Sequence, residues 1–222
     1  MYYTPGGRIL VALIYIFLTL ITNIIGFATP FWLESWPRVH TPISSIGLWT
    51  YCLNGFRVRL DPTFQVYFGC YWISATMLQD IRSKLCPWWC FLNQLISIFV
   101  LGLVIISLTG TFLFYISKVK NLELRKRISI VLFFIDVLIL AFICVIIVIF
   151  GAQSYNPNFY PYPDLAWPTW SYGLYILSGI LALLSGLHML LQYKLESRKL
   201  DERLMSFPMQ NFGLKNKTEK EL

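Results

Sequence analysis

Five cysteines carry the most reactive chemistry in this chain of 222 residues. Cys52 and Cys70 flank a segment that predicts a β-hairpin. Apolar and polar residues alternate over Phe56–Leu60, and Asp61-Pro62-Thr63 is typical of a turn. A bond between the two cysteines would join the base of this hairpin, and closing a loop of that size contributes on the order of 3 kcal/mol to stability. We therefore predict a disulfide between Cys52 and Cys70.

The other three cysteines allow several states. Cys86 and Cys90 lie four residues apart, and they could form a bridge, remain free thiols or bond to a partner protein. Cys144 lies within a long apolar segment, where a free thiol serves as inert packing. His40 is the only histidine near the paired cysteines, and no metal-ligand spacing surrounds it. We expect no metal site.

Asp136 and His188 are ionisable residues that lie inside long apolar segments. An unpaired charge in lipid is costly, so such residues are candidates for a functional site. Three interpretations are open. A protonated or hydrogen-bonded Asp136 could fix helix packing, Asp136 and His188 could pair, or they could relay a proton or an ion.

The sequence gives no support for catalysis. It has no Ser–His–Asp arrangement at plausible depths, no paired carboxylates in one loop and no glycine-rich phosphate-binding loop. Its basic residues lie beside apolar segments without a recognisable nucleic-acid-binding module. We therefore expect neither an enzyme nor a cofactor, and no nucleic-acid partner.

The composition indicates an integral membrane protein with lipid as its surroundings. Hydrophobic residues make up 57% of the chain and charged residues 13%, whereas soluble domains carry about 25% charged residues. Apolar stretches long enough to cross a bilayer predict four spans: 9–27, 91–116, 128–150 and 172–191. In the last span Ser178, Ala182 and Gly186 recur every four residues, which indicates a helix-packing face.

The distribution of Lys and Arg predicts the orientation of these spans. Thirteen of the 18 basic residues lie before the first span, between the second and third, or after the fourth. The positive-inside rule therefore places both termini in the cytosol of a multi-pass plasma-membrane protein. The remaining segments are a cytosolic N-terminus (1–8), a large outer loop (28–90), a cytosolic loop (117–127), a second outer loop (151–171) and a cytosolic tail (192–222).

The large outer loop predicts a small antiparallel sheet followed by a short helix. Strand candidates are 31–36, 46–53, 56–60 and 64–72. Apolar residues from Ile73 to Leu85 fall at near-helical spacing, and Ser74 could cap this helix. The expected fold class is an all-α membrane four-helix bundle with a small extracellular antiparallel β-sheet.

Aromatic residues are concentrated in the two outer loops and beside the spans. Trp88, Trp89, Trp167 and Trp170 could simply anchor helices in the interfacial belt. The proline-rich segment 157–163 carries further aromatic residues, and it could be either a contact tip or a segment that packs on the protein itself.

These residues together resemble a known family. Trp32, Gly47-Leu48-Trp49, Cys52 and Cys70, all between the first two of four spans, are similar to the W–GLW–C–C signature of the claudin, peripheral-myelin-protein and epithelial-membrane-protein superfamily. Tyr155-Asn156-Pro157 in the second outer loop is similar to the aromatic-Asn-Pro element of claudins.

The resemblance implies a claudin-like fold, a left-handed four-helix bundle under a sheet to which the second loop adds an edge strand. It implies a protein of cell–cell contacts and paracellular barriers, which assembles with its own copies or with claudin-like proteins in cis and in trans at cell junctions. The alternative is an auxiliary subunit of an ion channel or receptor. In claudins, charges between the loop cysteines set ion preference, so Arg57, Arg59 and Asp61 would make a pore lean weakly toward anions.

The chain departs from the claudin pattern at several positions. Its two loop cysteines lie further apart than usual, and Ser154 stands where a claudin would have Phe. The chain ends Lys220-Glu221-Leu222 instead of Tyr-Val, and no cysteine pair follows the fourth span. These differences favour a divergent claudin-like member.

Overall fold

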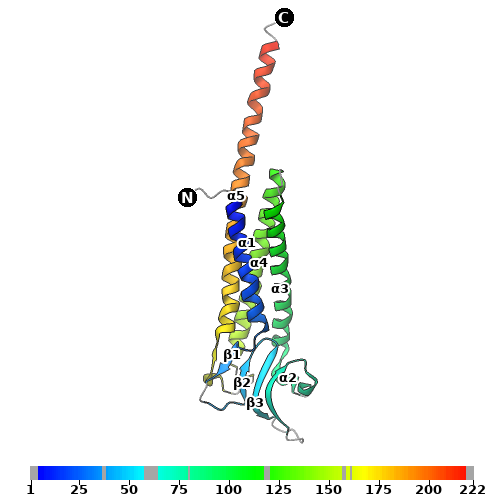
Figure 1. Ribbon diagram of the computed structural model, residues 1–222, viewed down its shortest axis with the longest axis vertical. Coiled ribbons are helices and arrows are strands. Elements are labelled where there is room, and N and C mark those ends of the chain that lie inside the picture. The colour runs from blue at the N-terminus through cyan, green and yellow to red at the C-terminus, as the bar shows by residue number, and fades with distance from the viewer. Residues whose placement is uncertain are drawn as a thin grey trace.

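Four long helices and one small sheet make up the computed structural model, which describes residues 5–36, 39–57, 65–79, 81–117, 121–156, 159–160 and 162–218 (Figure 1). The helices are α1 (Pro5–Ala28), α3 (Trp88–Ile116), α4 (Leu122–Ser154) and α5 (Trp170–Thr218). Each contains a stretch long and apolar enough to cross a membrane. The sheet lies at one end of the bundle, the sheet end; we call the other the tail end.

Helix α5 packs along both α1 and α4. A Cβ added to Gly179 would lie 3.2 Å from Ile143, and one added to Gly186 would lie 3.2 Å from the Cβ of Asp136. Ser178 and Ala182 are fully buried. Of the predicted small-residue face, Gly186 thus lies against α4, and Ser178 and Ala182 lie inside the bundle; small side chains at such positions let helix backbones approach closely.

A short polar network ties α4 to α5 near the tail end. Arg125 and Glu196 form an ion pair at 3.1 Å, and the Gln192 amide donates to the same carboxylate at 2.6 Å. Glu196 is almost completely buried. A buried carboxylate is tolerated because both partners satisfy it.

The sheet contains five antiparallel strands in the order β4-β3-β2-β1-β5. Their bounds are Leu33–Ser35 (β1), Ile43–Ile46 (β2), Thr50–Arg57 (β3), Val66–Trp72 (β4) and Ala166–Pro168 (β5). Strand β5 comes from the second loop and lies at an edge beside β1. The sheet therefore joins both loops into one unit, which we call the sheet module.

Two predicted strands are one strand in the structure. The candidate 46–53 covers the end of β2 and the start of β3, and β3 runs through the predicted gap at residues 54 and 55 to the first residues of the candidate 56–60, of which residues 58–60 lie outside the described part of the chain. The strand continues because its register against β4 shifts between Asn54 and Phe56, where Gly55 has a φ of 77°. Glycine accommodates this positive φ without a steric penalty. The strand therefore forms a bulge at this position and continues, where the sequence predicts that it ends.

The predicted amphipathic helix after β4 was wrong in its length and in its cap. It consists of two short turns, η1 (Thr76–Leu78) and α2 (Arg82–Leu85), and no side chain caps η1 at Ala75. The Arg82 guanidinium donates to the carbonyls of Ile73 and Ser74 at 3.0 Å. In a continuous helix these carbonyls would accept hydrogen bonds from backbone N–H groups of the next turn. Here the Arg82 guanidinium supplies the donors instead.

Candidate functional site

The sheet module is held together by a disulfide across its longest pair of strands. Cys52 and Cys70 face each other in the register of β3 and β4 and are bonded, as predicted. Cys86 and Cys90, whose state the sequence left open, are bonded as well. The second bond joins the residue after α2 to the first turn of α3, and the Tyr51 hydroxyl lies 3.5 Å from the Cys90 sulfur. Both disulfides therefore belong to the sheet end.

Trp32 anchors the first strand in the sheet end of the bundle. It is fully buried, and its indole N–H donates to the carbonyl of Gly26 at 2.6 Å. Its ring contacts Phe150 of α4 and Tyr175 of α5, with centroids 4.9 and 5.0 Å apart. One side chain thus connects β1 to three membrane helices.

Gly47 and Leu48 form the second attachment. A Cβ on Gly47 would lie 2.5 Å from the carbonyl oxygen of Thr29 and 2.6 Å from the Cα of Pro30, so only glycine fits between β2 and the end of α1. The carbonyl of the buried Leu48 accepts from the side-chain amide of Gln94 on α3 at 2.8 Å. This turn fixes the sheet to α1 and α3 together.

Trp49 completes the motif at the boundary between sheet and bundle. Its ring stacks on Trp72 of β4 at 5.8 Å and contacts Phe27 at the end of α1 at 5.2 Å. All four residues that carry the W–GLW resemblance therefore have a structural role. They hold the sheet module in one orientation on the helices.

The second loop is divided between packing and exposure. Phe159 contacts Trp89 with ring centroids 4.7 Å apart, and the Tyr160 hydroxyl donates to the carbonyl of Ile43 at 3.0 Å. Tyr155 and Tyr162 are exposed. The aromatic loop is therefore partly a self-packing element, one of the two interpretations that the sequence left open.

Asn156 makes the turn that ends α4. Its side-chain amide donates to Gln153, and its carbonyl accepts from the backbone N–H groups of Phe159 and Tyr160. Pro157, the third residue of the aromatic-Asn-Pro element, lies outside the described residues.

Burial changes the acid–base behaviour of two tyrosines in this module. The pKa of Tyr51 and that of Tyr160 are raised above the ordinary tyrosine value, because the charged phenolate would lose its hydration. For Tyr160, hydrogen bonds to Thr41 and Ser35 offset part of this increase. Both groups are neutral hydrogen-bonding hydroxyls at physiological pH.

The three charge-selectivity candidates are only partly placed. Arg57 is exposed at the end of β3, whereas Arg59 and Asp61 lie outside the described residues. The arrangement of these charges therefore stays a prediction.

Both edges of the sheet carry exposed aromatic side chains. On the β4 edge these are Phe68 and Trp72, and on the opposite edge Trp36 and Trp167 stack with centroids 5.9 Å apart. Strand β4 spans seven residues and has only β3 as a neighbour in the described sheet. We call Phe68, Trp72 and the free side of β4 the edge surface. An exposed apolar edge strand is a site for contact with another chain.

Asp136 and His188 do not act as a pair. The Ser107 hydroxyl donates to Oδ1 of Asp136 at 2.6 Å, while His188 stacks on Tyr15 of α1 at 5.7 Å. No ion pair joins the two residues, both of which belong to the described part of the chain. The possible Asp136–His188 pair is thus not present: the Ser107 hydroxyl on α3 donates to one carboxylate oxygen of Asp136, and His188 stacks on a side chain of α1.

Sequence reasoning missed several buried polar residues, two of which contact the sheet or Asp136. Gln94, Asn93 and Ser107 on α3 and Asn23 on α1 are all buried. Each is a polar residue within a predicted apolar span, which is a signal that could have identified them. Gln94 contacts the sheet directly, and Ser107 contacts Asp136.

Among the described residues, no group of three or more His, Cys, Asp or Glu side chains could hold a metal ion. Comparison of the sequence with models of known protein families gives no match, and comparison with curated proteins gives none either.

Proposed function

We propose that this chain is a claudin-like structural membrane protein, which forms cell–cell contacts and paracellular barriers through its sheet module. The observation that carries the proposal is the edge surface on a disulfide-bonded sheet, held rigidly at one end of a four-helix membrane bundle. A rigid sheet with an accessible apolar edge is suited to binding another protein, because little ordering entropy is lost on contact.

The attachment of the sheet supports this proposal. Within the W–GLW–C–C pattern, Trp32 and Gly47 hold the sheet on the helices, and the Cys52–Cys70 bond joins two strands within the sheet. In our proposal the sheet lies outside the cell, both termini lie in the cytosol, and copies of the chain or claudin-like proteins bind in cis and in trans at junctions of the plasma membrane.

The test is a mixed culture of cells that lack junctions, in which two populations express the full chain with different fluorescent tags. We expect both tags to be enriched at contacts between two expressing cells, and the electrical resistance of a monolayer to change. Uniform surface distribution together with co-purification of a larger channel would contradict the proposal and indicate an auxiliary subunit.

A pair of variants isolates the edge surface. Phe68→Lys places a charge on the β4 edge, where the side chain is 61% exposed, and should reduce enrichment at contacts. Met77→Lys is the matched control, because Met77 is 65% exposed but lies on η1 outside the sheet. Equal enrichment of both variants would exclude the β4 edge as the contact.

A further inference from the structure

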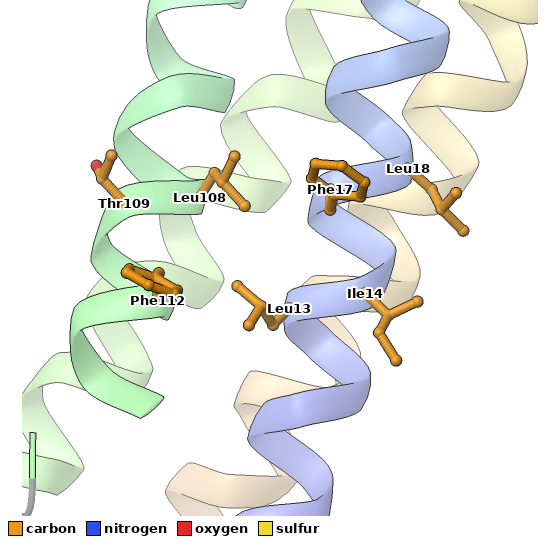
Figure 2. Close-up of a pocket in the computed structure, with 7 residues that line it drawn as sticks. All are labelled: Leu13, Ile14, Phe17, Leu18, Leu108, Thr109 and Phe112. Atoms are coloured by element: carbon orange, nitrogen blue, oxygen red, sulfur yellow. The ribbon is translucent and has the colours of Figure 1, made fainter. Parts of the chain in front are cut away.

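An apolar groove of about 520 Å³ runs between α1 and α3 on the side of the bundle. Figure 2 shows Leu108 and Phe112 of α3 directed toward Leu13 and Phe17 of α1 across the groove. Ile16 of α1 and Val104 of α3, which come from the same two helices, are fully buried in the core of the bundle. Phe17 and Phe112 are about half exposed, so the groove opens sideways.

The lining of this groove offers no free polar atom. Thr109 is the one polar residue in the lining, and its hydroxyl donates to the carbonyls of Ile105 and Ile106 in its own helix. An occupant that brought a hydroxyl, amide or charge into the groove would leave that group unpaired, at a cost of several kcal/mol. The groove therefore suits a purely hydrocarbon occupant.

The groove also has a defined depth in the membrane. At 1.5 Å per residue, Leu13–Leu18 lies about 6–14 Å from the tail-side end of the span 9–27. Residues 108–112 lie about 6–12 Å from the tail-side end of α3 at Ile116. Half of a hydrocarbon core is about 15 Å thick. The groove is thus confined to the leaflet on the tail side.

We propose that this groove binds one acyl chain of a phospholipid from the tail-side leaflet. An acyl chain occupies one leaflet, whereas a partner helix would cross both and would contact α1 and α3 along their length. The lining consists of seven residues, far fewer than the roughly 20–30 residues on each side of a stable protein–protein interface. A second copy of this chain or another protein is therefore a poor match for so small a surface.

The test uses the full chain in nanodiscs of phosphatidylcholine that contain a small fraction of phosphatidylcholine with a photoactivatable diazirine on one acyl chain. After illumination and digestion, mass spectrometry locates the labelled residues. We expect adducts on 13–18 and 108–112 in about tenfold excess over the lipid-exposed positions Phe134 and Val148 of α4. Even labelling of all exposed positions would overturn the proposal.

Two tryptophan variants show whether the groove itself holds the chain. Leu108→Trp fills the groove and should remove the excess labelling of α1, whereas Ile106→Trp, at an exposed position outside the lining of the same helix, should preserve it. Leu13→Trp fills the groove from the other wall and replaces Leu108→Trp if that variant is not monodisperse. Unchanged labelling in a filled variant, or displacement of the label by a sterol but not by excess phosphatidylcholine, would overturn the proposal.

Discussion

Single residues attach the sheet to the bundle through shape and hydrogen bonds. Gly47 lets the backbone of the sheet lie against the backbone at the end of α1, where any side chain would keep the two apart. Trp32 donates to a carbonyl of α1, and its ring contacts α4 and α5. Asp136 follows the same principle inside the bundle, where it accepts from Ser107.

Gly47→Ala should lower the free energy of unfolding by about 1–3 kcal/mol, because the new methyl group overlaps backbone atoms that cannot rotate away. Gly173→Ala is the control, since an added Cβ there meets no heavy atom within 4 Å. Thermal unfolding of both variants in the same detergent measures the difference. Equal midpoints would show that the turn relaxes.

Asp136→Asn should leave the yield of monodisperse protein and its unfolding temperature nearly unchanged, because the amide oxygen still accepts from Ser107. Asp136→Leu should cost about 1–3 kcal/mol, since the buried Ser107 hydroxyl loses its partner. Size-exclusion chromatography and thermal melts distinguish the two. Loss of the folded protein with Asn would instead show that the charge itself is required.

The sheet module should lose stability in alkaline solution. The pKa of Tyr51 and that of Tyr160 are raised above 10.0 in the folded chain. In the unfolded chain both phenols are exposed to water and lose their protons at a lower pH. Their contribution to stability is complete below pH 10.0 and is lost as the pH rises beyond it. Melts of the wild type and of Tyr51→Phe between neutral and alkaline pH measure this, and the variant should show the smaller decline.

At the scale of elements, the sequence predicts types better than boundaries. The four spans, the β3–β4 hairpin and its disulfide follow from hydrophobic runs, period-two alternation and cysteine positions. The bulge at Gly55 and the broken helix before α3 do not, because each depends on a contact that one segment does not encode. Arg82 binds carbonyls upstream of it, and Gly55 needs β4 beside it.

The candidate site was predictable to a similar degree. The positions of Trp32, Gly47 and the two paired cysteines could be identified, but not their partners, since Gln94 and Phe150 lie far away in the sequence. The edge surface depends on strand order, which alternation alone does not determine.

The two disulfides should differ in their effect on stability. Loss of Cys52–Cys70 should cost about 3 kcal/mol and loss of Cys86–Cys90 about 2 kcal/mol, because the first closes the longer loop. Paired serine substitutions at each bridge, followed by thermal melts, test this order. The reverse order would mean that the second bridge has a larger role in positioning α3 than its loop length implies.

The whole molecule places its sheet and the start of α1 at opposite ends of the bundle, with the tail of α5 beyond the end where α1 begins (Figure 1). Four membrane-crossing helices return the chain to the side on which it began. In our proposal, which follows the positive-inside rule, the sheet lies outside the cell and the tail inside.

Glycan mapping tests this orientation. The acceptor sequence Asn216-Lys217-Thr218 should stay unmodified, whereas Val58→Asn combined with Leu60→Thr should create a site that is glycosylated. A shift in mobility on glycosidase treatment measures both. A glycan on Asn216 would invert the orientation.

Only Thr169 separates β5 from α5, and its backbone N–H donates to the carbonyl of Trp32. Helix α5 then continues for 49 residues, about 70 Å, as one rod through the bundle and past its tail end. A displacement of β5 would therefore be passed directly into α5 and along it past the tail end of the bundle, in addition to the contacts by which Trp32 and Leu48 pass it to the other three helices.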